Sequence, residues 1–299
     1  MKYLIGILLL TVLLSCHSDN KLNKRLIVCS TSIIADCISQ IVGTDFSVVP
    51  LMGPGVDPHS YNPRPKDLKL LNSATIVIYN GFHLEGKMQA VFHQLSKRKQ
   101  VIALAHFYPK SAQITLNKYG AIDPHIWFGT YDWLTSIRGA TKKLSLLYPT
   151  YETRFHDRYR LFQHKVRLTS RRAISKFASI PYSQRVLITS HDAFHYFGNT
   201  FGLKVMSLQG VSTVQEPSLK HVYELVDYIV KYKVKALFIE NSVSPKTVQL
   251  IIESAQKRNA NVQLGGTLYS DALGPKNQLG GTYLGMIQHN CSVIYKSLK

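Results

Sequence analysis

A long stretch without glycine or proline limits the folds that are open to this chain. Residues 150–179 contain neither, and Pro149 and Pro181 bracket them. Apolar residues recur along one face and charged side chains fill the other faces, which predicts one amphipathic helix of about 28 residues, roughly 42 Å long. A helix of this length in the middle of the chain indicates a rigid strut. The apolar residues that recur at three- and four-residue steps are Phe155, Tyr159, Phe162, Val166, Ala173 and Phe177.

Short apolar runs alternate with helical patterns on both sides of this stretch. Such alternation is typical of parallel sheets flanked by helices. We therefore predict an α/β fold with two lobes, 26–149 and 181–299, each a parallel sheet flanked by helices, joined by one long rigid helix over 150–180. The predicted strands are 26–30, 46–52, 75–79, 101–104, 186–189, 204–208, 236–240 and 262–264. The helices predicted between them are 31–42, 64–72, 218–232 and 246–259.

The amino-terminal residues have the pattern of an export signal. An apolar run at 4–14 follows a single positive charge. It is too short to span a bilayer comfortably, which takes about 20 residues, and is typical of a secretory signal. The run Leu13-Leu14-Ser15-Cys16 resembles the bacterial lipobox, in which the cysteine becomes lipidated. We expect a lipoprotein signal peptide at 1–15, a tether at 16–25 and an exported, membrane-anchored protein; the alternative is an ordinary cleaved signal with Cys16 incidental.

Three further cysteines leave two interpretations open. Cys29 and Cys37 lie on a predicted strand and the helix after it, and Cys291 is near the end of the chain. An oxidising compartment permits a disulfide between the first two. The alternative is that all three are small buried hydrophobic residues.

The chain is strongly basic, with 36 Lys+Arg against 17 Asp+Glu and a formal net charge of +19. We interpret this charge as a solvated basic surface, because no recognised nucleic-acid motif contains the basic residues. Attraction to an acidic partner is the alternative. We expect a monomer that does not bind nucleic acid.

Three histidines and one aspartate stand out by their position. His59, His125 and His191 lie in the segments GPGVDPHSYN, DPHIWF and ITSHDAF, and Asp271 lies in TLYSDALG. At least three of the four follow a predicted strand, and ligands of open α/β sheets bind beyond the carboxyl ends of strands. Three imidazoles and a carboxylate suit zinc and neighbouring transition metals. Each histidine taken singly is more often a structural residue.

Longer segments of the sequence resemble one family, the substrate-binding lipoproteins of metal-import ABC transporters known as the zinc/manganese-binding cluster A-I. The resemblance runs from about residue 26 to 298. The family fold is two α/β lobes joined by one rigid helix, with the metal site in the cleft between the lobes. The segments that carry the resemblance are GPGVDPHSYNPRPKD (53–67), DPHIWF (123–128), SHDAFHYFGNTFGLKV (190–205), LQGVSTVQEPS (208–218), ALFIENSVSP (236–245) and SDALG (270–274).

The resemblance implies a function and assigns residues to it. His59, His125, His191 and Asp271 match the four family positions that bind the metal. The implied cargo is one divalent transition-metal ion, and the implied partner is an ABC permease. A ligand imidazole needs an acceptor that orients it; the acidic residues suggested for this role are Asp123, Asp192 and Glu240.

The sequence leaves the metal open among zinc, manganese and ferrous iron. The segment at 107–122 lacks the histidine- and acid-rich loop of many zinc-specific members, which weakens a zinc-scavenging assignment. His191 stands where some members have glutamate, which favours nitrogen-preferring metals. The alternatives are a surface adhesin using the basic face and, less favoured, a zinc hydrolase. A hydrolase needs an open metal position for water, and no HExxH motif occurs, so we expect no enzyme activity.

Overall fold

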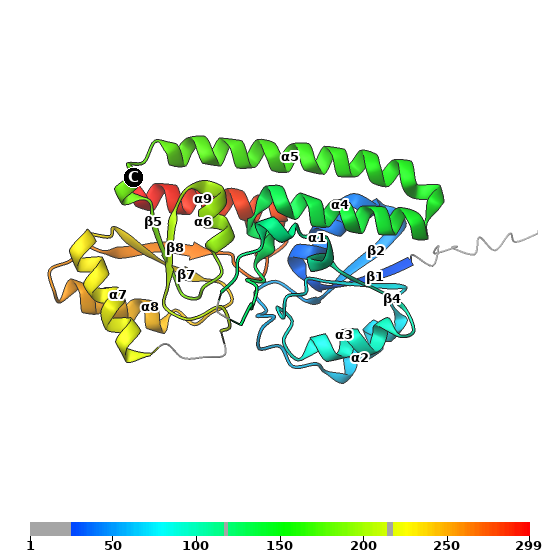
Figure 1. Cartoon of the computed structure of the whole chain (residues 1–299), viewed down its shortest axis with the longest axis horizontal. Helices are drawn as coiled ribbons and strands as arrows, with labels where there is room; N and C mark the ends of the chain where they lie inside the picture. Colours follow the sequence, from blue (N-terminus) through cyan, green and yellow to red (C-terminus); the bar gives the residue numbers. More distant parts are fainter. Residues whose placement is uncertain (1–24, 117–118, 214–217) are drawn as a thin grey trace, which may run out of the picture.

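The structure, a computed structural model, describes residues 25–116, 119–213 and 218–299. Two lobes lie side by side along a long helix, α5 (Glu152–Ala178), as Figure 1 shows. The predicted signal peptide, Cys16 and the tether up to residue 24 lie outside the described residues. Within the described ranges, no helix is both long and apolar enough to cross a membrane.

The amino-terminal lobe contains a four-stranded parallel sheet with the order β2-β1-β3-β4. Its central strand is almost entirely buried, as expected for a parallel sheet covered on both faces. Thr31 ends this strand and caps the helix that follows by accepting a hydrogen bond from the backbone of Ile34. The strands are β1 (Arg25–Thr31), β2 (Phe46–Met52), β3 (Ile76–Tyr79) and β4 (Gln100–Ala103). The helices are α1 (Ser32–Val42), α2 (Pro65–Ser73), α3 (Met88–Ser96) and α4 (Thr130–Leu147).

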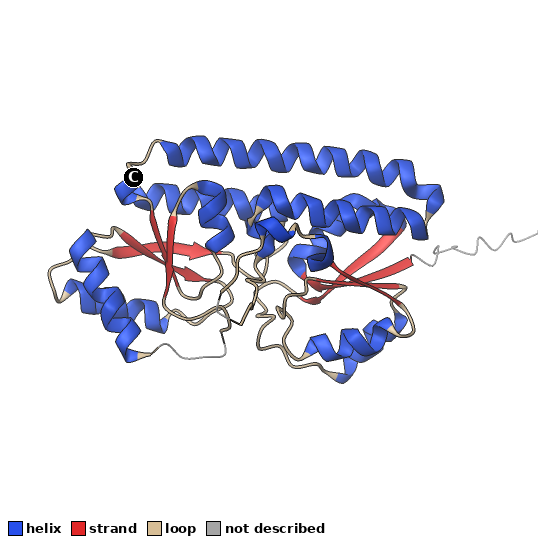
Figure 2. Cartoon of the chain, viewed as in Figure 1, coloured by secondary structure: helices blue, strands red, loops and turns tan. Residues whose placement is uncertain are grey.

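The carboxy-terminal lobe contains two parallel strand pairs, β5-β6 and β7-β8. Helices surround these strands, as Figure 2 shows. The strands are β5 (Val186–Thr189), β6 (Lys204–Ser207), β7 (Ala236–Glu240) and β8 (Gln263–Leu268). The helices are α6 (His195–Phe201), α7 (Leu219–Tyr232), α8 (Lys246–Gln256) and α9 (Tyr283–Leu298).

Helix α5 connects the lobes through a shared hydrophobic core. It packs against α1 and α4 of the first lobe and against α6 and α9 of the second. One cluster of buried side chains includes Ile38 of α1, Phe162 of α5 and Ile294 of α9. Because close-packed cores resist continuous deformation, we expect the lobes to move relative to one another by small displacements and not by a wide hinge opening.

We expect Phe162→Ala to destabilise the protein by about 3–5 kcal/mol, because it removes a large side chain that is 2% exposed. Urea unfolding followed by circular dichroism measures this loss. The matched control is Leu161→Ala on the same helix, where the side chain is 55% exposed. The control changes stability by less than about 0.5 kcal/mol. Equal losses in the two variants would contradict the packing of α5 into a shared core.

The predicted fold class, two α/β lobes and a long helix, is confirmed. The eight predicted strands all occur. The long helix was predicted at 150–180, and each of its predicted ends lies within two residues of the corresponding end of α5. Helices α3, α4, α6 and α9 were not predicted. Cys29, Cys37 and Cys291 are buried free thiols, which agrees with the second interpretation of the cysteines.

Candidate metal centre

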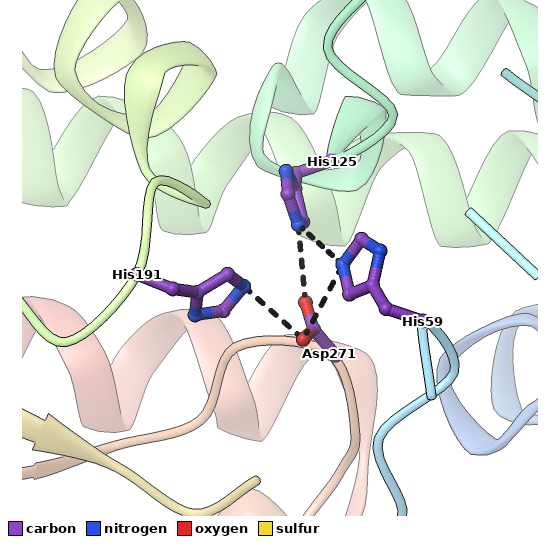
Figure 3. A group of neighbouring side chains, drawn as sticks. All are labelled: His59, His125, His191 and Asp271. Carbon is purple, nitrogen blue, oxygen red and sulfur yellow. Dashed lines mark hydrogen bonds and ion pairs between the residues drawn. The ribbon is translucent and has the colours of Figure 1, made fainter. Parts of the chain in front are cut away.

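The four predicted ligand side chains meet between the two lobes. One ligand atom each from His59, His125, His191 and Asp271 lies within 4.8 Å of the other three. Figure 3 shows the three imidazoles and the carboxylate pointing toward a common centre. Two side chains come from each lobe, and all four lie in segments that follow a strand.

His59 lies in the loop after β2, and Asp57 fixes the conformation of that loop. The Asp57 carboxylate accepts the backbone N–H of His59 at 2.8 Å and the hydroxyl of Thr213, from the other lobe, at 2.6 Å. Gly86 lies directly behind the loop with φ of +45°, and a Cβ there would lie 2.6 Å from the carbonyl oxygen of His59. The absence of a side chain at Gly86 therefore allows the His59 backbone its position.

His125 is oriented by the aspartate two residues before it. Oδ1 of Asp123 accepts the backbone N–H of His125 at 2.9 Å and contacts ring atom Nδ1 at 2.8 Å. Both residues are fully buried. Since Nδ1 is held by the carboxylate, Nε2 faces the centre, as in metal sites where a carboxylate fixes the tautomer of a ligand histidine.

His191 follows β5 and is oriented by a carboxylate from a different strand. Glu240, the last residue of β7, accepts the backbone N–H of His191 through Oε1 at 2.9 Å. Its other oxygen lies 2.6 Å from Nδ1 of the ring. Nε2 of His191 therefore faces the centre.

Asp271 completes the group from the loop after β8. Its carboxylate lies 3.2 Å from Nε2 of His191, 3.4 Å from Nε2 of His125 and 3.8 Å from Nε2 of His59. The preceding residue, Ser270, is tied to the other lobe because its carbonyl accepts the indole N–H of Trp127 at 3.0 Å. A single carboxylate thus contacts all three imidazoles.

Four spacings among the ligand atoms are near those expected around a tetrahedral cation. Ligand atoms about 2.0–2.1 Å from a tetrahedral zinc ion lie about 3.3–3.4 Å apart. The Nε2 atoms of His59 and His125 are 3.2 Å apart, and the contacts to Asp271 span 3.2–3.8 Å. Both oxygens of Asp271 and Nε2 of His191 are buried, and their neighbours among the described residues are one another and the two other imidazoles, at 3.2–3.8 Å. A bound cation satisfies these atoms, and buried polar atoms without any partner are costly.

Burial and charge act in opposite directions on the ligand protonation states. Burial lowers the pKa of His59 to about 4, against the attraction of Asp271. Burial also opposes the charged form of His125, but Asp123 and Asp271 outweigh it and raise that pKa to about 9. For His191 the carboxylates of Glu240 and Asp271 likewise outweigh burial and hold the pKa well above its usual range. The histidine charges outweigh the burial of Asp271 and hold its pKa well below the usual range.

The suggested orienting acids differ in what they contact. Asp123 and Glu240 each contact a candidate ligand directly. Asp192 instead lies 3.2 Å from Nε2 of His195, a residue that the sequence analysis did not single out. Nδ1 of His195 lies 3.1 Å from Oδ2 of Asp123, so His195 bridges the two aspartates. The signal for it in the sequence is only the three-residue helical step from Asp192.

A cavity of about 710 Å³ lies beside the centre, and of the four candidate ligands only His59 lines it. His59 is also the least buried of the four, with its side chain 5% exposed. His59 is therefore the candidate ligand that lies nearest to this cavity. Its other lining residues include Phe82 and His83, whose φ values of 50° and 63° place both in the left-handed region.

We expect Glu240→Gln to weaken metal affinity by about 10–100-fold, because the acceptor that orients His191 loses its charge. Competition with a coloured chelator measures the change. Glu253→Gln, an exposed position on α8, is the control and leaves affinity unchanged. A Glu240→Gln variant with the parent affinity and the parent melting temperature would contradict the orienting role.

Comparison with known proteins identifies relatives that match most of the chain. The family model described as zinc-uptake complex component A, periplasmic, matches residues 27–297. The manganese-binding lipoprotein MntA of Bacillus subtilis is 40% identical over 273 residues, covering 91% of this chain and 89% of the relative. The manganese ABC transporter substrate-binding lipoprotein PsaA of Streptococcus mitis is 25% identical over 297 residues, covering 96% and 94%.

The fold agrees with a solved relative. The structure of the periplasmic zinc-binding protein TroA of Treponema pallidum superposes with a TM-score of 0.89 at 38% identity, covering 92% of this chain and 99% of that one. Sequence comparison also finds TroA at 38% identity over 275 residues. On the family match and these relatives, the chain belongs to the zinc-uptake complex component A family of periplasmic metal-binding proteins.

Proposed function

We propose that this protein captures one divalent transition-metal ion outside the cytoplasm and delivers it to an ABC permease. The observation that carries the proposal is the convergence of three imidazoles and one carboxylate, with ligand atoms within 4.8 Å of one another and several of them otherwise unsatisfied. Its relatives MntA, TroA and PsaA are named for binding manganese or zinc, and PsaA for serving an ABC transporter.

The proposed ligands are His59, His125, His191 and Asp271, with Asp123 and Glu240 orienting two of the imidazoles. A site with three nitrogens and one oxygen binds zinc more tightly than manganese or ferrous iron when the isolated protein is offered each metal. The metal delivered in the cell then depends on availability as well as affinity. The proposal therefore includes zinc, manganese and ferrous iron as the ion that is delivered.

The proposed anchor is a lipid on Cys16, reached through the tether at 16–25 after removal of the signal peptide at 1–15. This places the folded lobes, 26–149 and 181–299 with their connecting helix at 150–180, on the outer side of a membrane that carries the permease. The relatives MntA and PsaA are named as lipoproteins.

Capture follows from the position of the cavity. An ion that enters from the cavity meets His59 first, because the other three side chains are fully buried behind it. When all four proposed ligands surround the ion, they exclude water from it. The movement that brings them together is small and local, because α5 restrains the lobes. The hydroxyl contact from Thr213 to Asp57 crosses between the lobes beside His59 and stabilises the closed arrangement.

The same geometry argues for binding without catalysis. A hydrolytic zinc ion keeps one position for water. Four protein side chains that fill a tetrahedral shell leave no such position. The protein therefore stores and hands over its ion without breaking a bond.

Metal loading tests the proposal. The chain from residue 17 onward is dialysed against zinc, manganese and ferrous iron in turn, beside the double variant His59→Ala/His191→Ala. We expect one equivalent of metal in the parent and none in the variant, with unchanged circular dichroism. A parent that holds none of the three ions would contradict the proposed function.

A further inference from the structure

The positive charge of the chain is concentrated on helix α5. Eight of its 27 residues are Lys or Arg and only two are acidic, whereas the whole chain has 36 Lys or Arg in 299 residues. The helix lies along one long side of the molecule and packs with its apolar stripe against both lobes, as Figure 1 shows. Its outer face is therefore a basic surface that spans both lobes.

Exposed leucines lie in the middle of this basic face. The Leu161 side chain is 55% exposed and the Leu168 side chain is 39% exposed. They are seven residues apart, or about two helical turns, so they share one face of the helix. Exposed basic residues flank them on both sides: Arg160, Lys165, Arg167, Arg171 and Arg172. The apolar stripe of α5 is buried in the protein, so these two leucines add apolar contact area to an otherwise charged outer face, along which Lys and Arg side-chain stems can lie.

A hollow of about 230 Å³ opens in the same face. Arg160, Arg167 and Arg171 line it together with His164 and Leu168. Guanidinium groups bind phosphate through paired N–H donors, which is why arginine is frequent at phosphate sites. Arg160 also pairs with Asp157 on the same helix, so Arg167 and Arg171 are the two guanidinium groups that the hollow offers to one phosphate group.

The chain enters the fold next to this helix. Arg25, the first residue of β1, donates a hydrogen bond to the hydroxyl of Tyr151 at 3.3 Å, and Tyr151 directly precedes α5. Eight residues lie between Cys16 and Arg25, and the nine residue-to-residue steps that join them reach at most about 30 Å. An anchor at Cys16, which is part of the proposed function, therefore holds α5 close to the bilayer.

We propose that the outer face of α5 binds the anionic phospholipid headgroups of the membrane to which the protein is anchored. No residue of α5 lines the cavity beside the metal centre, so lipid contact leaves that cavity open to the solution. This surface acts independently of metal binding.

Vesicle binding by the chain from residue 17 onward, which holds the whole described fold without its lipid, tests the proposal. Vesicles of phosphatidylcholine alone are compared with vesicles that also contain phosphatidylglycerol. We expect binding only to the anionic vesicles, weakening as salt rises. The triple variant Arg167→Gln/Arg171→Gln/Arg172→Gln should lose roughly 100-fold in affinity, about 5-fold for each charge.

A matched variant removes the same charge elsewhere. Lys66→Gln/Lys69→Gln/Lys97→Gln alters exposed lysines on and beside α2 and α3, away from α5. It should keep most of the vesicle affinity, and both variants should keep the zinc affinity of the parent. Equal losses in the two variants would show that binding follows net charge, and equal binding to neutral vesicles would show that it ignores lipid charge. Binding to heparin without binding to anionic vesicles would assign the surface to a soluble polyanion; each of these outcomes overturns the proposal.

Discussion

Asp271→Asn lowers zinc affinity by more than about 100-fold, which is beyond the 10–100-fold typical of residues that only orient a ligand. Asp271 is the one carboxylate that contacts all three candidate histidines, and it is fully buried. Asparagine keeps its volume but removes the only anionic ligand of the set. The cation then loses an oxygen ligand and the charge that compensates its own.

Isothermal titration calorimetry against zinc, with a competing chelator for the parent, measures this loss. The matched control is Asp227→Asn, an exposed aspartate on α7 that pairs with Arg258, and it should bind zinc like the parent. The far-ultraviolet circular dichroism of Asp271→Asn should match that of the parent. A folded variant with an affinity within tenfold of the parent would remove Asp271 from the ligand set.

Zinc affinity depends steeply on pH, by about 100-fold for each unit between roughly pH 5 and 8. In the metal-free protein the pKa of His125 is raised to about 9 and that of His191 is also well above its usual range, so both rings carry a proton in this window. His59, with its pKa lowered to about 4, is already neutral. A metal binds only neutral imidazole, so each binding event displaces about two protons and affinity rises as pH rises.

Calorimetry in buffers of different ionisation enthalpy counts these protons directly. We expect about two protons released per zinc ion at pH 7, and about one in His191→Ala, which keeps His125. Asp271 contributes none, because its low pKa leaves it ionised throughout. Zinc binding without proton release at pH 7 would contradict the expectation that His125 and His191 are protonated, and paired with carboxylates, in the metal-free protein.

Much of the fold was readable from local sequence patterns. The stretch without glycine or proline predicted α5. The prediction succeeded because the apolar residues of this helix form one stripe, which both lobes cover. Helices α4 and α9 were not predicted, although each has at least 16 residues. Both contain glycine, which weakens a helix prediction from sequence. Their stability comes from packing against α5 and the lobes, which local patterns do not reveal.

The sequence predicted only part of the candidate metal site. Strand ends and matching motifs pointed to the four ligand residues, but no sequence spacing predicts that their ligand atoms lie within 4.8 Å of one another. The pairing of Glu240 with His191 joins residues 49 positions apart. His195 had no motif of its own, since its role depends on how α6 meets the loop that carries Asp123. The contact of His195 with Asp123 depends on how α5 places the two lobes, and the pairing of Glu240 with His191 depends on how β5 and β7 pack within one lobe.

The ligand set itself is tested most directly by anomalous diffraction from crystals grown with zinc. We predict one strong peak between the lobes, about 2.0–2.2 Å from Nε2 of each of the three histidines and from one carboxylate oxygen of Asp271. A peak at another place, or an ion in the cleft that leaves any of the four side chains unbound, would contradict the account.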